Sequence, residues 1–178
     1  YQDRSIDRET TDRIIQAAMR APTAGNMMLY SILEIEDQAI KDKLARSCDD
    51  QPFIARAPLV LLFLADYQRW FDAYLAFDVP SFCAAKGERM RLPGEGDLLL
   101  ACCDALIAAQ TAVIAAESLG IGSCYVGDVM ERYEYHRDLL NLPRYTFPVT
   151  LLCFGYPMPA ARKRALTPRF PQACVHFK

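Results

Sequence analysis

One long apolar segment constrains the fold of this chain more than any other part of its sequence. Leu98 to Leu119 is rich in alanine and leucine, follows Asp97 and precedes Gly120, so it has the composition and end signals of a helix that Asp97 caps. Apolar side chains lie on nearly all its sides. Its narrow polar strip consists of Asp104, Thr111 and Ser118. We expect this helix in the centre of a fold or at a subunit interface, with the strip facing another chain or a ligand.

Helical and alternating patterns on both sides of this segment predict a mixture of helices and strands. Further helices are predicted over 6–20, 37–47, 67–82 and 131–140. Strands are predicted over 29–36, 58–65, 123–126 and 148–155. Several connections are too short for repeated βαβ crossovers, so the pattern favours an α+β fold with a mixed, largely antiparallel central sheet flanked by helices.

Composition and charge narrow the class of protein. The 178 residues, 52% of them hydrophobic, suit one globular domain covering residues 1–178. The formal net charge of -2 gives no field to gather nucleic acid or anionic lipid. The apolar runs 57–65 and 149–154 are far shorter than the roughly 20 residues that cross a bilayer, and no charged leader opens the chain, so we expect no membrane partner.

Cysteine and histidine usage argues against disulfides and metals. Seven cysteines is an odd number, and several lie in apolar segments, as free buried thiols would: Cys102, Cys103, Cys124 and Cys153. This favours a reducing, cytoplasmic location. No Cys-x-x-Cys occurs and the chain has only two histidines, so we expect no metal site.

Common catalytic motifs are missing. The chain has no Gly-x-Gly-x-x-Gly, no phosphate-binding P-loop and no Gly-x-Ser-x-Gly nucleophile elbow. His136 lies in a polar helical run and is expected to be solvated, and His176 lies near the chain end. Acid–base chemistry by protein side chains alone is therefore poorly supported, which favours a cofactor with its own reactivity.

Three turn segments carry the functional signal: 21–27, 120–128 and 162–171. The first offers a rigid proline, a hydroxyl and an amide after a helix. The second ends a strand at a glycine whose neighbouring N–H groups can approach a flat ring. The third supplies guanidinium groups that can grip a phosphate. Taken alone, each segment is better explained without a function: the first as a plain turn, the second as a hairpin and the third as a solvated surface.

In this order, with the alanine-rich helix directly before the second segment, the three segments resemble the nitroreductase family of FMN enzymes. The resemblance extends over essentially the whole chain and includes the turn at 50–53, the strand end at 155–157 and the terminal 168–171. Gln51 and the Pro-Arg-x-Pro ending are most similar to the larger, flavin- or nitro-reducing branch. The resemblance implies an α+β homodimer with an FMN in each of two sites at the subunit interface.

The resemblance also implies a set of FMN-binding residues. Those implied for the ring and ribityl chain are Pro22, Thr23, Asn26, Gln51, Tyr125, Val126, Gly127 and Asp128. A backbone N–H of the Gly127–Asp128 pair is expected near flavin N5. Arg169, helped by Lys163 or Arg164, is expected to hold the phosphate.

Three departures from the family pattern bear on these expectations. The family's arginine-containing motif would precede Tyr1, so we expect the domain to lack its first residues. Thr167 stands where this branch often has lysine. Asp128 stands where a second glycine is common, and its carboxylate would disfavour the anionic reduced flavin and lower the flavin potential.

The implied activity needs no catalytic side chain, because flavin N5 carries the chemistry. NAD(P)H and a small-molecule acceptor, which is a nitroaromatic, a quinone or a flavin, would use one face in turn by a ping-pong mechanism. We expect Trp70, Phe71 and Tyr74 to cap the flavin, although an ordinary core helix explains these aromatics equally well. The alternatives are another reaction on this scaffold, such as dehalogenation or flavin breakdown, and an FMN-binding protein without useful turnover.

Overall fold

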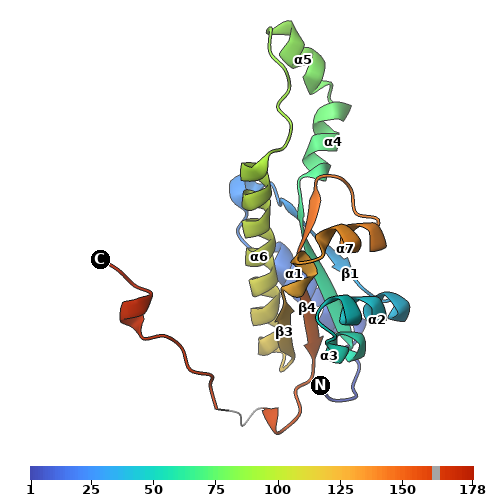
Figure 1. The fold of residues 1–178 in the computed structure, drawn as a ribbon, viewed down its shortest axis with the longest axis vertical. Helices are drawn as coiled ribbons and strands as arrows, with labels where there is room; N and C mark the ends of the chain where they lie inside the picture. The colour runs from blue at the N-terminus through green and yellow to red at the C-terminus, as the bar shows by residue number, and fades with distance from the viewer. Residues whose placement is uncertain (162–164) are drawn as a thin grey trace.

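A computed structural model describes residues 1–161 and 165–178 (Figure 1). Its helices are α1 (Arg8–Met19), α2 (Gln38–Ser47), α3 (Pro52–Arg56), α4 (Gln68–Ala76), α5 (Val79–Ala85), α6 (Glu95–Ser118) and α7 (Tyr133–Leu139). Its strands are β1 (Tyr30–Glu34), β2 (Leu59–Asp66), β3 (Gly122–Val126) and β4 (Thr146–Gly155). Short 3-10 turns are η1 (Ala24–Asn26), η2 (Asp128–Met130) and η4 (Gln172–Cys174).

The four strands form one sheet in the order β1-β2-β4-β3. Every strand pair in this sheet is antiparallel, with Tyr30 opposite Ala65 and Val126 opposite Leu151. The α+β prediction is therefore confirmed, while the described strands contain no parallel pair of the kind that a mixed sheet requires. The reason is topological: β2 and β3 run in the same direction, but β4 lies between them, so no two neighbouring strands are parallel.

Helices cover both faces of the sheet. The side chains of β2 alternate between two cores: Leu61 and Phe63 face α1 and α6, and Val60 and Leu62 face α2 and α3. All eight residues of β2 are buried, as expected for a continuous apolar strand in the centre of a sheet. Figure 1 shows α6 lying along one side of the sheet, with α2 and α3 on the other side.

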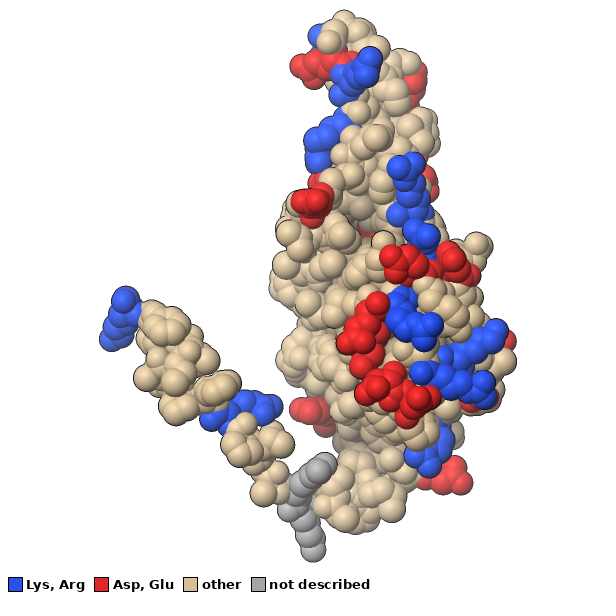
Figure 2. Space-filling view, in the orientation of Figure 1, with Lys and Arg blue, Asp and Glu red and all other residues tan. Residues whose placement is uncertain are grey.

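Helix α6 has one packed face and one exposed face. The packed face is made of small residues that let the helix lie close to the sheet and to α1: Ala101, Ala105, Ala108, Ala109, Ala112 and Ala116. Its opposite face leaves large apolar side chains in contact with solvent: Leu99, Leu106, Ile107 and Ile114. The surface over α6 carries almost no charge, whereas charges gather over α2, α3 and α7 (Figure 2).

One prediction about this helix needs correction. Asp97 is not the N-cap; Gly94 is, and the carboxylate of Asp97 reaches back to accept the Gly94 N–H at 2.8 Å. Arg91 pairs with the same carboxylate and lowers the pKa of Asp97 to about 2. By length and composition alone Glu95–Ser118 could cross a membrane, and in this fold it packs against the sheet and α1.

The cysteines are less buried than expected. Among the four predicted to be buried, only Cys153 is; Cys102 and Cys124 are partly exposed, and Cys103 is exposed. Ala101 lies on the packed face of α6. Cys103 comes two residues later, about 200° further around the helix, so its side chain points outward. All seven cysteines have free thiols.

Two segments extend beyond the sheet and its covering helices. Helices α4 and α5 form an arm that has no buried residue, and it leaves Phe77 84% exposed. Residues 165–178 run away from the sheet at the other end of the molecule, with Leu166, Phe170 and Phe177 almost bare (Figure 1). Both segments therefore expose apolar surface that their own chain does not cover.

Candidate functional site

The turn between α1 and β1 is organised by one buried carboxylate. Asp104 of α6 is only 2% exposed, and its oxygens accept hydrogen bonds from the hydroxyl of Thr23 and from the N–H groups of Ala24 and Leu29, at 3.0 and 3.2 Å for the last two. The hydroxyl of Thr23 in turn accepts the N–H of Met28 at 2.8 Å. Helix α6 thus holds this turn in a single conformation.

These contacts correct the interpretation of the polar strip on α6. Asp104 faces its own chain rather than another subunit or a ligand. Thr111 and Ser118 donate to carbonyls one turn back in the same helix, Ile107 and Ala115. Their spacing of seven residues places the three side chains on one stripe of the helix. Which groups that stripe contacts depends on the tertiary fold.

The exposed part of this turn has unusual backbone geometry. Gly25, Asn26 and Met28 have φ values of 56°, 57° and 51°, and this left-handed region is uncommon for residues other than glycine. Pro22, Gly25 and Asn26 are exposed, and the Asn26 amide has no hydrogen-bond partner among the described residues. We call residues 22–28 the turn group. It presents the rigid ring of Pro22, the bare backbone of Gly25 and the unpaired side-chain amide of Asn26.

Helix α4 is tied to the turn group. The indole N–H of Trp70 donates to the carbonyl of Met27 at 2.8 Å, and its ring lies 6.1 Å from that of Tyr74. Phe71 points instead toward Tyr145, with 4.8 Å between the ring centroids. The three predicted cap residues therefore lie beside the turn group and the start of β4, and their capping role stays a prediction.

A second group of predicted residues meets at the end of β3. The amide of Gln51 donates to the carboxylate of Asp128 at 3.2 Å and to the carbonyl of Cys48 at 2.9 Å. The side chain of Val126 is buried, so only its backbone can face a ligand. Tyr125 is exposed and its hydroxyl donates to Gln110 of α6 at 3.2 Å. We call Gln51 and residues 125–128 the ring group.

The backbone of the ring group offers unused donors. The N–H groups of Gly127 and Asp128 donate to no protein acceptor in the part of the chain that the structure describes. They lie where β3 has ended and η2 begins, so neither a strand partner nor a helical carbonyl is available to them. Two adjacent free donors suit a ligand with an acceptor at its edge.

The two groups occupy opposite edges of the sheet. The turn group leads into β1 and the ring group follows β3, and the strand order β1-β2-β4-β3 puts these two strands at the outer positions. Three inter-strand spacings amount to roughly 14 Å. Within one chain the two groups therefore lie apart rather than side by side.

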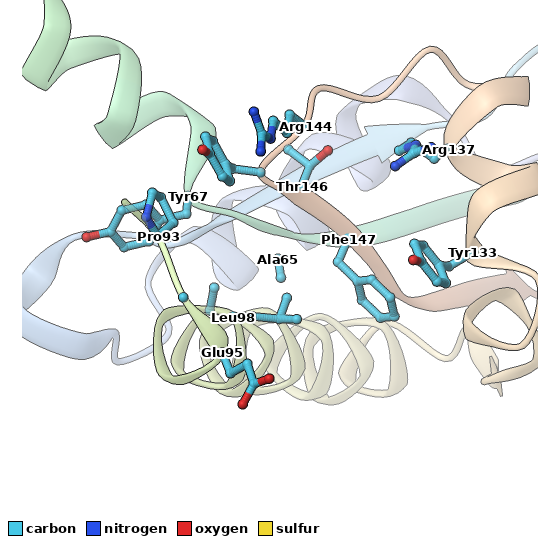
Figure 3. Close-up of a pocket in the computed structure, with 13 residues that line it drawn as sticks. Ala65, Tyr67, Pro93, Glu95, Leu98, Tyr133, Arg137, Arg144, Thr146 and Phe147 are labelled. Carbon is cyan, nitrogen blue, oxygen red and sulfur yellow. The ribbon is translucent and has the colours of Figure 1, made fainter. Parts of the chain in front are cut away.

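A cavity of about 550 Å³ lies near the ends of β2 and β4, beside the start of α6 (Figure 3). Tyr133 and Phe147 lie side by side in its wall, with 5.2 Å between ring centroids, and Tyr67 and Pro93 lie at the other side. None of the predicted FMN-binding residues lines it. The aromatics at 133–147 are the sequence signal that could have located this cavity.

Arg169 is the one predicted phosphate-binding residue that the structure describes, and its hydrogen bonds are to neither group. Arg169 is exposed and donates to its neighbours, the Thr167 hydroxyl at 2.8 Å and the Pro168 carbonyl at 3.3 Å. Lys163 and Arg164 lie outside the described residues. The role of these cations stays a prediction.

His136 is fully buried, so the prediction of a solvated side chain is wrong. Nδ1 lies 2.8 Å from the carbonyl of Val129 and Nε2 lies 2.7 Å from the hydroxyl of Ser47. A carbonyl only accepts, so Nδ1 carries the proton and Nε2 accepts from Ser47. Burial lowers the pKa of His136, which keeps the ring neutral.

Comparison with known proteins matches residues 1–156 to the nitroreductase family. The chain belongs to this family. The prediction of the family from the sequence is thereby confirmed, and so is the fold, since the solved structure of B. megaterium NfrA2 superposes with a TM-score of 0.87 at 34% identity, covering 100% of this chain and 68% of that one.

Two further relatives of this nitroreductase-family chain have named activities. The FMN reductase [NAD(P)H] of Bacillus subtilis (strain 168) is 35% identical over 180 residues, covering 100% of this chain and 68% of its own length. The NADPH:FMN oxidoreductase from Vibrio harveyi, solved in complex with NAD+, superposes with a TM-score of 0.83 at 26% identity, covering 100% of this chain and 70% of that one.

Proposed function

We propose that this chain is the FMN-binding domain of an NAD(P)H-dependent oxidoreductase. The observation that carries the proposal is the ring group, in which the free N–H groups of Gly127 and Asp128 lie next to the amide of Gln51. Named relatives that act as FMN reductases support the same cofactor and the same electron donor.

The donor set fits FMN. Gly127 and Asp128 would donate to the edge of the isoalloxazine ring, and the exposed ring of Tyr125 would lie beside it. The Asn26 amide and the backbone of Gly25 would meet the polar ribityl chain, while Thr23 keeps the turn in shape through Asp104. When bound, FMN supplies the two-electron chemistry that no side chain here provides. The phosphate would be held by Arg169, with Lys163 or Arg164.

We infer a homodimer, because each half-site needs its complement. A two-fold axis beside α6 would bring the turn group of one subunit to the ring group of the other, which the opposite edges of one sheet cannot do. The exposed apolar face of α6 supplies the surface for such a contact, since Leu99 and Ile114 are 66% and 61% exposed.

Because the chain has no dinucleotide-binding motif, NAD(P)H and the acceptor are proposed to use the same open face in turn. The acceptor is a nitroaromatic, a quinone or a flavin. Initial rates at several concentrations of NAD(P)H and a quinone should give parallel double-reciprocal lines. Intersecting lines would mean a ternary complex and would contradict the shared face.

Reduction of the bound flavin, followed by a screen of acceptors, separates the alternative functions. A flavoprotein without useful turnover would bind FMN that NADH and NADPH reduce no faster than free flavin. A dehalogenase or a flavin-degrading enzyme would be reduced normally but would turn over only with a halogenated substrate or would consume the flavin itself. A screen of these acceptors under anaerobic conditions distinguishes each case from the proposed activity.

A further inference from the structure

His136 connects three elements that surround the ring group. It belongs to α7, it donates to Val129 in η2, and it accepts from Ser47 at the end of α2. Both His136 and Val129 are 0% exposed, so water does not compete for these bonds. The imidazole therefore bridges η2 and the end of α2 within the buried core.

Gln51 provides a second attachment of η2, at the residue before Val129. Gln51 follows α2 and holds the carboxylate of Asp128, the first residue of η2, while His136 holds the carbonyl of Val129, the next residue. Ser47 and Gln51 are close in sequence at the corner between α2 and α3. The short turn is thus fastened to one corner at two successive residues.

This fastening bears directly on the free donors of the ring group. The N–H of Asp128 belongs to the peptide that enters η2, so its direction depends directly on the position of η2. The N–H of Gly127 belongs to the peptide that leaves β3, so β3 and η2 together set its direction. A turn of three residues has little hydrogen bonding of its own to keep it in place. On the β3 side, the hydroxyl of Thr150 donates to the carbonyl of Val126 at 3.4 Å, and on the η2 side His136 holds the carbonyl of Val129 at 2.8 Å.

We propose that His136 is a positioning residue that sets the direction of the Gly127 and Asp128 N–H groups toward the flavin ring. The inference rests on the proposed function, because it takes the ring group as the place where FMN binds. His136 itself touches no cofactor in this arrangement. It acts through the carbonyl of Val129.

Two substitutions at the same position separate this role from simple stability. The amide nitrogen of His136→Asn falls near the place of Nδ1 and keeps the donor to Val129, whereas His136→Gln keeps a polar group near Ser47 and leaves the Val129 carbonyl without a donor. His176→Gln is the matched control, because His176 is exposed and is the only other histidine.

The readouts are the Kd for FMN, measured by quenching of flavin fluorescence, and the absorption spectrum and midpoint potential of the bound flavin. We expect His136→Gln to raise the Kd about tenfold and to shift the spectrum and potential, since an unpaired buried carbonyl moves its segment. His136→Asn and His176→Gln are expected to stay within about threefold of the wild type.

Equal behaviour of the Asn and Gln variants, whether both like the wild type or both impaired, would overturn the proposal. Wild-type protein that binds no FMN would instead sink the proposed function. Should His136→Gln fail to fold, His136→Asn and Ser47→Ala carry the test. Both keep the Val129 bond, so wild-type FMN affinity in both supports the positioning role and a tenfold loss in either contradicts it.

Discussion

At the scale of single residues, Asp104 carries much of the order in the turn group. Three donors converge on its buried carboxylate, and an asparagine of the same size could satisfy only part of them because its NH₂ group would face N–H donors. We expect Asp104→Asn to lower the free energy of unfolding by about 1–3 kcal/mol.

Urea denaturation measures this change, and Thr111→Ala is its control, because Thr111 lies on the same stripe of α6 but bonds only its own helix. The control should change stability by less than about 0.5 kcal/mol. Equal losses in the two variants would show that Asp104 contributes no more than an ordinary surface residue.

The buried histidine predicts a pH dependence of stability. Burial lowers the pKa of His136 and the charge of Arg132 adds to the effect, so its contribution is present above the unfolded value of about 6.5 and is lost as pH falls through the lower folded value. Between pH 7.5 and 5, the wild type should lose more unfolding free energy than His136→Asn. Parallel pH profiles would contradict this assignment.

His136 also illustrates what local sequence leaves out. The run around it is polar, and six of the seven residues of α7 are charged or carry a hydroxyl or imidazole, which is typical of a solvated helix. The partners that make burial tolerable, Val129 and Ser47, lie elsewhere in the chain. Their convergence is a property of the fold and has no local signal.

At the scale of elements, the indole of Trp70 fastens the α4–α5 arm to the turn group. Trp70→Phe keeps an aromatic ring but removes the donor to Met27, so the arm should move more freely above the turn. We expect the KM for a bulky acceptor to change by about threefold to tenfold, with the FMN Kd unchanged.

Steady-state kinetics with a small and a bulky quinone tests this expectation. Phe77→Ala is the matched control, because Phe77 lies at the end of the same helix and is 84% exposed. If the KM of Trp70→Phe equals that of the wild type for each of the two quinones, Trp70 has no role in acceptor selection.

Most elements could be predicted from the sequence because their signals are local. The helix predicted over 37–47 is α2, with Asp37 as its N-cap, and the apolar run predicted as a strand over 58–65 forms the buried central strand β2. Two details could not be predicted this way. Asp78, in a left-handed conformation, splits the aromatic segment into α4 and α5, and Pro52 begins the separate short helix α3. Each depends on how one residue turns the chain.

At the scale of the whole molecule, the exposed face of α6 determines whether a complete site can form. Ile114→Glu places a charge in the middle of this apolar face and should prevent the proposed dimer. Sedimentation should then give a monomer, and the FMN Kd should rise more than about tenfold, because each chain would keep only one half of each site.

Ala39→Glu is the control for the added charge, since Ala39 is exposed on α2 at the other side of the sheet. It should remain dimeric with wild-type FMN affinity. A monomeric Ile114→Glu variant that binds FMN as tightly as the wild type would refute a site shared between subunits.

The division of the site could not be predicted from the order of motifs along the chain. The motifs indicated the family and several residues that the structure brings together, notably Gln51 and Asp128. They contained no information on strand order, and it is the strand order that separates Thr23 from Gly127 across the sheet. The extent of the domain over residues 1–178 stays a prediction.

The most direct test of the central claim is the flavin content of the purified protein. The account predicts a yellow protein that releases one FMN per chain on denaturation, or that takes up one FMN per chain when FMN is added. NADH or NADPH should reduce this bound flavin faster than it reduces free FMN. A colourless protein that takes up no FMN would contradict the account.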